Sequence, residues 1–192
     1  MGITANDFFE NIYSVIFSPK AFFEKESINT SIRLSIGTII FISIINKLAI
    51  GIFDKSILYW TFIPGFIWYI VSVVILWFLT ALFFEYIAKI FDRSGNINKL
   101  LFLTAFAPIP YIFFAPLNLL KSSGEFGYVV ASIAELFLYI WIIYLYVLAL
   151  KSTYKISIAR AYMMIFIPFI SIFFAIYWTV CFCQKMWYIF SM

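Results

Sequence analysis

The chain has 192 residues, of which 65% are hydrophobic and 11% are charged, whereas soluble domains carry about 25% charged residues. So few polar residues cannot cover the surface of a soluble fold, and the mean hydropathy of +1.04 agrees. The composition therefore predicts an all-α, polytopic membrane protein. Histidine is absent, which excludes a histidine base and zinc sites built on histidine. The net charge of +4 fits basic residues that set membrane topology, and no basic face interleaved with aromatics indicates nucleic-acid binding.

Residues 1–30 are predicted to form the first unit, a pair of amphipathic helices lying in the membrane interface. In residues 4–16, apolar side chains recur at helical spacing on one face and polar side chains lie on the other. Ser18 and Pro19 then suit the N-cap and first position of a second short helix. The side chains expected to insert among lipids are Phe8, Phe9, Ile12, Ile16, Phe22 and Phe23. The alternative is that these helices pack on the protein's own membrane domain.

Residues 31–192 are predicted to form the second unit, a domain of five transmembrane helices. Each apolar stretch reaches the length of about 20 residues that a helix needs to cross the hydrocarbon. The expected spans are residues 31–53, 60–86, 99–120, 127–150 and 160–183. Short connections that contain glycine, asparagine and charged residues separate these spans.

Counting lysine and arginine in the connections predicts the orientation, because cytoplasmic loops carry an excess of both. With five spans, one side of the membrane receives nine of the 13 basic residues: Lys20, Lys25, Arg33, Lys89, Arg93, Lys99, Lys151, Lys155 and Arg160. This asymmetry predicts a cytoplasmic N-terminus and a C-terminus outside.

The third span contains three prolines, Pro108, Pro110 and Pro116. Each lacks a backbone N–H, so several carbonyls within the span lose their helical partner and need another. The sequence therefore predicts a kinked helix. The kink either has a purely structural purpose or forms a flexible gate.

Two ionisable residues fall inside predicted spans, Lys47 in the first and Glu135 in the fourth. Charges in the hydrocarbon are costly and usually find partners, and these two lie at similar depth. We therefore expect a Lys47–Glu135 ion pair, with Asn46 and Asn118 completing an intramembrane polar site. The pair either fixes helix packing or lines a cavity that accepts an ion, a proton or a lipid headgroup.

No motif for an enzyme or a cofactor is visible: the sequence lacks a phosphate loop, a nucleophile elbow and a metalloprotease motif. Without histidine, Cys181 and Cys183 cannot complete a four-ligand zinc site. The sequence thus predicts a protein that is not an enzyme and has no cofactor and no metal.

Three stretches together resemble the Yip family, five-span membrane proteins whose eukaryotic members interact with Rab GTPases. Phe17–Phe23 is similar to a Ser-Pro segment with two phenylalanines in the bacterial branch. Phe91–Leu101, followed by Ala105–Pro108, resembles the family's stretch between spans two and three. The third is Leu138–Leu150, with Trp141, and then Lys151, Ser157 and Ala161. The resemblance covers essentially the whole chain and implies a compact, prokaryotic-type member. The Asp-Leu-Tyr-Gly-Pro motif of eukaryotic members does not occur, so Rab binding is not carried over.

The resemblance and the composition together predict a non-catalytic integral membrane protein that organises or shapes membranes by binding lipids or membrane proteins. Its expected partners are membrane lipids, other membrane proteins or further copies of the chain, and no nucleic acid. Its expected location is the cytoplasmic (inner) membrane of a prokaryote. The alternative is a small transporter, channel or lipid-moving protein that uses the site around Lys47 and Glu135. An accessory subunit of a larger complex is a third possibility.

Overall fold

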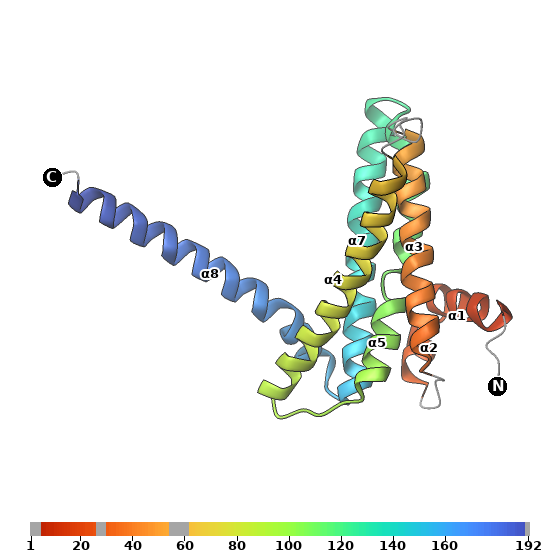
Figure 1. Cartoon of the computed structure of the whole chain (residues 1–192), viewed down its shortest axis with the longest axis horizontal. Coiled ribbons are helices and arrows are strands. Elements are labelled where there is room, and N and C mark those ends of the chain that lie inside the picture. Colours follow the sequence, from red (N-terminus) through yellow and green to blue (C-terminus); the bar gives the residue numbers. More distant parts are fainter. Residues whose placement is uncertain (1–4, 26–29, 54–61, 191–192) are drawn as a thin grey trace.

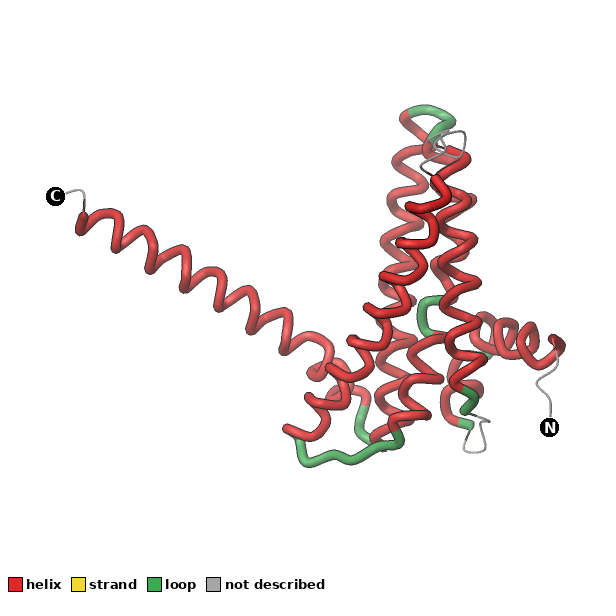
Figure 2. Tube along the Cα trace, viewed as in Figure 1, coloured by secondary structure: helices red, strands yellow, loops and turns green. Residues whose placement is uncertain are grey.

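The computed structural model describes residues 5–25, 30–53 and 62–190, and the regular elements among them are all helices. They are α1 (Ala5–Phe17), α2 (Pro19–Glu24), α3 (Ile32–Phe53), α4 (Phe62–Ile90), α5 (Ile97–Phe106), the 3-10 helix η2 (Ile109–Phe113), α6 (Phe114–Lys121), α7 (Glu125–Tyr154) and α8 (Ile158–Phe190). Figure 1 shows the long helices α3, α4 and α7 running alongside one another in an upright bundle. Helix α1 lies across this bundle, and α8 leaves it near its base (Figure 2).

Four stretches are long and apolar enough to cross a membrane: Ile32–Ile52, Phe62–Ile90, Ile97–Lys121 and Glu125–Tyr154. They coincide closely with the first four predicted spans, so the chain is a multi-pass membrane protein. The fifth predicted span, residues 160–183, falls within α8. The apolar stretch found there, Ile158–Pro168, is shorter than a span, and the fifth crossing stays a prediction.

The third span is broken into α5, η2 and α6. Helix α5 starts at an Asn96 cap, whose Oδ1 accepts the backbone N–H groups of Asn98 at 2.9 Å and Lys99 at 3.4 Å. It ends where Pro108 offers no N–H to continue the ladder. The Pro108 carbonyl instead accepts the N–H of Tyr111 at 2.9 Å, which begins the tighter 3-10 turn. The helix of the third span is thus interrupted at Pro108 and continues as η2 and then α6.

The first part of this broken span lies at the centre of the hydrophobic core. Every residue from Leu100 to Pro110 is buried, and α5 contacts α3, α4 and α7. The indole Nε1 of Trp77, on α4, donates a hydrogen bond to Thr104 Oγ1 at 3.2 Å. This bond satisfies a polar pair that would be costly to leave unpaired in an apolar interior.

Helix α2 packs into the bundle and does not lie among lipids. Phe22 and Phe23 are only 6% and 0% exposed, and the Phe22 ring lies 5.4 Å from that of Phe106 and 6.3 Å from that of Phe102. The prediction that Phe22 and Phe23 insert into the membrane is therefore wrong. Two adjacent phenylalanines on a short amphipathic helix can be buried in a protein groove or in lipid, because both remove apolar surface from water. The sequence therefore does not distinguish the two environments.

An ion pair fixes the end of α2 to the end of α7, with Lys151 Nζ 2.6 Å from Glu24 Oε1. At the same end of the bundle, the Tyr154 hydroxyl donates to Glu85 Oε2 at 2.6 Å. Helix α8 starts after this point and buries Ala161, Met164 and Ile165. Beyond them it projects from the bundle (Figure 1), and most of the described side chains between Phe166 and Phe182 are apolar and exposed.

Candidate functional site

A cavity of about 480 Å³ opens inside the bundle, between α3, α4, the η2–α6 part of the third span and α7. Its walls combine aliphatic side chains with an unusual number of hydroxyl and amide groups. The polar lining residues are Ser43, Asn46, Tyr69, Thr80, Tyr111, Asn118, Tyr139 and Tyr146. None of the described residues that line it carries a formal charge. Such a lining suits a neutral amphiphilic molecule or the uncharged part of a lipid.

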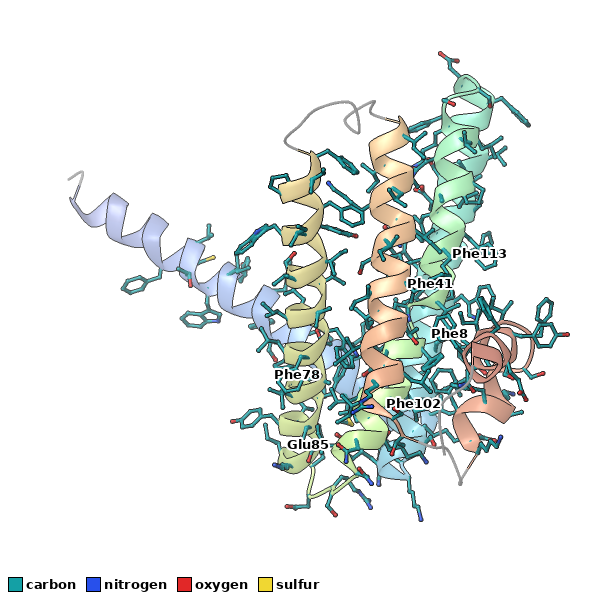
Figure 3. All side chains as sticks on the ribbon, turned by 45° about the vertical axis from the view of Figure 1, so that its right-hand side comes forward. Phe8, Phe41, Phe78, Glu85, Phe102 and Phe113 are labelled. Carbon is teal, nitrogen blue, oxygen red and sulfur yellow. The ribbon has the colours of Figure 1, made fainter. Side chains whose placement is uncertain are left out.

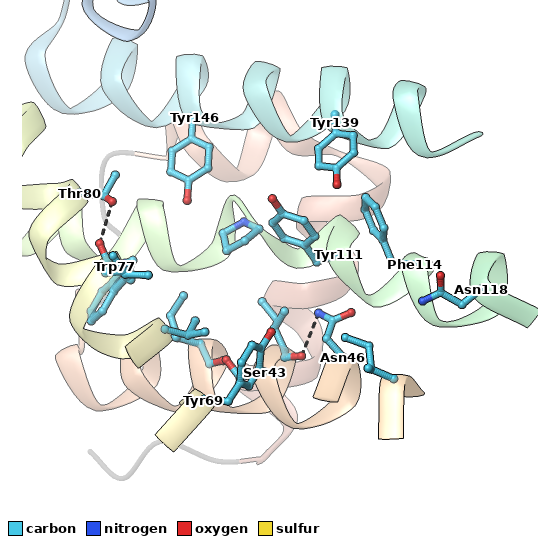
Figure 4. Close-up of a pocket in the computed structure, with 16 residues that line it drawn as sticks. Ser43, Asn46, Tyr69, Trp77, Thr80, Tyr111, Phe114, Asn118, Tyr139 and Tyr146 are labelled. Carbon is cyan, nitrogen blue, oxygen red and sulfur yellow. Dashed lines mark hydrogen bonds between the residues drawn. The ribbon is translucent and has the colours of Figure 1, made fainter. Parts of the chain in front are cut away.

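The tyrosines supply the hydrogen-bonding capacity of this cavity. Figure 4 shows the hydroxyls of Tyr139 and Tyr146 directed from α7 toward the cavity, with Tyr111 facing them from η2. Among the described residues these three hydroxyls and that of Tyr69 have no hydrogen-bond partner. They are therefore available to a bound molecule.

The two asparagines predicted for a polar intramembrane site both line this cavity. Asn46 donates through Nδ2 to the carbonyl of Ile42 at 3.1 Å, so its carbonyl oxygen is left to accept. Asn118 lines the same cavity from α6 (Figure 4). The asparagines of two different spans thus share one polar surface.

The predicted ion pair between Lys47 and Glu135 is wrong. Glu135 pairs with Lys121, whose Nζ lies 2.6 Å from Oε1 and 2.7 Å from Oε2. Lys47 instead places its ammonium 5.6 Å from the ring centre of Tyr69 and 6.0 Å from that of Phe62. Neither charged residue belongs to the cavity lining.

The direction of the side chains explains why Glu135 pairs with Lys121 and not with Lys47. Side chains on a helix tilt toward its N-terminus. Lys121, at the end of α6, therefore leans back along α6, while Glu135 leans toward the start of α7. Because α6 and α7 are antiparallel neighbours joined by a short turn, the two side chains meet. In the sequence Lys121 falls in a predicted connection between spans, so depth in the membrane alone favours Lys47 as the partner of Glu135.

Helix α1 presents three different surfaces. Toward the bundle it packs Phe8, Ile12, Val15 and Ile16, and the Phe8 ring lies 5.4 Å from that of Phe41 on α3 (Figure 3). Away from the bundle runs an aromatic stripe of Phe9, Tyr13 and Phe17, which are 61%, 62% and 68% exposed. Between these surfaces lies a polar edge with exposed Glu10.

Of the six residues predicted to insert into lipid, only Phe9 is therefore among the exposed ones. Tyr13 and Phe17 belong to the outward surface, and sequence reasoning missed both. Their signal was present, because residues at i, i+4 and i+8 form one stripe along a helix. The ring centres of Tyr13 and Phe17 lie 4.5 Å apart, which makes the stripe a continuous surface.

The structure also gathers basic residues at the lower end of the bundle in Figure 1, where α4 and α7 end and α5 and α8 begin. This end carries Lys89, Arg93, Lys99, Lys151, Lys155 and Arg160. Lys99 Nζ donates to the carbonyl of Ser152 at 3.3 Å. This hydrogen bond joins the start of α5 to the end of α7. In the described part of the chain no three cysteine, aspartate or glutamate side chains come together as a metal site.

Comparison with known protein families gives a match that covers most of the chain. The model of the Yip1 domain matches residues 13–179, which include the end of α1 with Tyr13 and Phe17, the cavity and the basic end. No curated protein matches the chain. No solved structure matches it either.

Proposed function

The chain belongs to the Yip1 domain family, and on that premise we propose that it is a non-catalytic membrane protein that organises or shapes a membrane. It does so by binding lipids or other membrane proteins. The observation that carries this proposal is the geometry of α1, which combines a protein-facing side, an exposed aromatic stripe and a polar edge. A helix with these three surfaces suits a position in the membrane interface beside its own bundle.

The aromatic stripe acts as a wedge in one leaflet. Phe9, Tyr13 and Phe17 enter the boundary between headgroups and acyl chains while Glu10 stays in water. Inserting side chains into one leaflet and not the other expands that leaflet, and the bilayer bends to accommodate the difference. Figure 1 shows α1 lying across the upright helices, the direction that an in-plane helix requires.

The attachment of α1 and α2 to the bundle holds this wedge at one depth. Phe8 packs against Phe41, Phe22 against Phe106, and Glu24 pairs with Lys151. A tethered helix cannot leave the interface as a free amphipathic peptide does, so even a short stripe stays inserted. We assign α1 to the cytoplasmic leaflet of a prokaryotic inner membrane, because the basic end of the bundle lies near α2.

The test removes the stripe without touching the packed side of α1. In the variant Phe9→Ser/Tyr13→Ser/Phe17→Ser, three exposed aromatic side chains are lost, which at about 1.5 kcal/mol each weakens insertion by roughly 4 to 5 kcal/mol. Purified protein would be reconstituted into vesicles, and membrane deformation followed by electron microscopy. We expect the variant to deform vesicles far less than the unchanged protein.

The matched control is Phe126→Ser/Val129→Ser, at the start of α7. These side chains are 84% and 54% exposed and lie at the opposite end of the bundle from the basic residues. The control should keep its deforming activity, and both variants should keep their thermal stability in detergent. A stripe variant that folds and still deforms vesicles as before would refute the wedge.

A second function, as a small transporter or lipid-moving protein, is favoured by the cavity alone. The unpartnered hydroxyls and the asparagine amides offer a polar surface within the bundle, and the prolines beside it weaken the helix that forms one wall. In this version the polar site is centred on Asn46 and Asn118, and Lys47 and Glu135 lie outside it. Flux or lipid transfer in proteoliposomes that is lost in Asn118→Leu/Tyr139→Phe and kept in Glu135→Gln would select this function over the first.

A further inference from the structure

A second hollow, of about 360 Å³, lies at the basic end between the end of α4 and the start of α8. We call it the arginine groove; its lining residues are Phe91, Arg93, Ile156, Arg160, Met163 and Met164. It is separate from the aromatic stripe of α1 and from the intramembrane cavity. Two guanidinium groups and four apolar side chains therefore share one small depression.

The backbone holds the first arginine in place. Helix α4 ends in a pair of hydrogen bonds, from Asp92 N–H to the Lys89 carbonyl at 3.0 Å and from Arg93 N–H to the Ala88 carbonyl at 2.9 Å. Asp92 sits in the left-handed region with a φ of 53°. This pattern is the Schellman ending of a helix. It turns the chain sharply, so Arg93 folds back beside α8 and does not extend into the following loop.

The second arginine, Arg160, makes one end of the groove cationic, while the other end is apolar. Arg160, Met163 and Met164 are spaced three and four residues apart, so they share one face of α8. Met163 is 54% exposed, while Met164 and Ile156 are buried and form the floor. Moving along α8 from Arg160 by about one turn, or ~5 Å, leads from a cationic rim to an apolar wall. A phospholipid has the same order of groups, a phosphate followed by acyl chains.

The charges around the groove favour an anion. In the described part of the chain neither Arg93 nor Arg160 has an ion-pair partner. Of the acidic residues nearby, Glu85 is engaged by Tyr154 at 2.6 Å, and by Lys89 at 3.9 Å. Asp92 is exposed beside Arg93 and is outnumbered by the two arginines and Lys89. Arginine pairs matched to phosphate oxygens form charge-assisted hydrogen bonds that a single lysine does not reproduce.

We propose that the arginine groove binds an acidic phospholipid, with the phosphate held between Arg93 and Arg160 and an acyl chain lying along Met163. Basic pockets between the cytoplasmic ends of membrane helices are suited to such lipids. The inference does not depend on the wedge function of α1, and its failure would leave that function intact. It assigns to the base of α8 the role of holding a boundary lipid where this helix departs from the bundle.

The experiment measures lipid retained by the full chain. The protein would be placed in nanodiscs of phosphatidylcholine containing phosphatidylglycerol, released gently, and weighed by native mass spectrometry. The groove variant is Arg93→Gln/Arg160→Gln, and the matched control is Lys20→Gln/Lys25→Gln, which removes the same charge at the same end of the bundle. We expect the groove variant to retain roughly tenfold less phosphatidylglycerol than the control variant. Equal losses in both would show only diffuse attraction and overturn the proposal.

Two further measurements identify the ligand and guard against a misfolded variant. Met163→Ser removes an exposed apolar side chain, which leaves the fold intact and should lower lipid retention several-fold while both arginines remain. Inorganic phosphate, added in excess to the unchanged protein, should not displace the lipid. Displacement by inorganic phosphate, or full retention in Met163→Ser, would show a phosphate site and refute a lipid site.

Discussion

Helix α4 and the broken third span are both apolar enough to cross a membrane but occupy different environments. The most apolar window of α4 has a mean hydropathy of 2.4 and is 11% buried within the protein. The corresponding window of residues 97–121 has a hydropathy of 1.9 and is 61% buried. The less hydrophobic of the two is therefore the core of the molecule. Hydropathy measures the free energy of leaving water and does not distinguish lipid from protein as the new surroundings.

The difference between these two regions lies in the pattern of side chains. Along α4 the buried residues Trp77, Ala81, Phe84 and Ala88 recur every three or four positions, so one stripe meets the bundle and the rest faces outward. From Leu100 to Pro110 no such stripe exists, because neighbours cover every side. The small residues Ala105 and Ala107 allow the surrounding helices to approach this segment closely.

The largest expected effect comes from replacing one phenylalanine by alanine in each of the two regions. Phe102, on α5, is 1% exposed and Phe83, on α4, is 46% exposed. We expect Phe102→Ala to lower the free energy of unfolding by about 3 to 5 kcal/mol, because it opens a cavity among the Phe22 and Phe106 rings. Phe83→Ala should change it by less than about 0.5 kcal/mol. Reversible unfolding in mixed micelles measures both, and similar losses would contradict the assignment of α4 to the lipid side.

The next effect concerns the Lys121–Glu135 pair, whose side chains are 28% and 16% exposed. We expect Glu135→Ala to cost about 2 kcal/mol, because it leaves the Lys121 ammonium without its partner in an apolar setting. Adding Lys121→Met should restore part of this loss, and adding Lys47→Met should not. A double-mutant cycle for each pair measures the coupling. Coupling of Glu135 to Lys47 would revive the pairing that the sequence suggested.

The sequence predicted the helical class, the first four spans and the interruption at Pro108 because each depends on a local pattern. Apolar length gives a span, and a missing N–H breaks a ladder. It failed where the answer depends on which helices are neighbours. The pairing of Glu135 and the burial of Phe22 and Phe23 both follow from packing between segments far apart in the chain.

The candidate site divides in the same way. Asn46 and Asn118 were predictable as polar residues inside spans, and both line the cavity. The tyrosines that contribute most of its hydroxyls were not, since tyrosine also favours membrane interfaces and lipid-facing surfaces. For α1, periodicity identified an amphipathic helix but could not decide which part of its apolar face the bundle covers.

Two glycines test, with smaller expected effects, whether the region of α5 is covered by neighbouring side chains and α4 is not. A Cβ at Gly95, before α5, would lie 2.6 Å from Tyr154 Cε1, and Tyr154 is buried and held by Glu85. We therefore expect Gly95→Ala to destabilise the protein by about 1 to 2 kcal/mol. A Cβ at Gly65, in α4, meets nothing within 4 Å, so Gly65→Ala should stabilise by up to about 1 kcal/mol. Thermal unfolding in detergent measures the two opposite signs, and destabilisation by both would mean that α4 is covered.

The smallest effect tests whether α2 belongs to the packed region. The hydrogen bond and charge of Lys151, with a smaller contribution from Lys20, lower the pKa of Glu24 below its ordinary value of 4.5. A carboxyl whose pKa is depressed in the folded state stabilises the protein above the unfolded pKa, and this contribution is lost as the pH falls through the folded pKa.

The unchanged protein should therefore have a slightly higher Tm than Glu24→Gln at neutral pH, and the two should converge below about pH 4.5. Because the pair lies at the surface, salt should shrink the difference as well. Glu10→Gln, which removes one carboxylate from the exposed polar edge of α1, is the matched control for the loss of a charge. If Glu24→Gln melted like the unchanged protein at every pH, α2 would be held by Phe22 and Phe23 alone. The contact between Glu24 and Lys151 would then add no stability, and the packed region would end at Phe22 and Phe23.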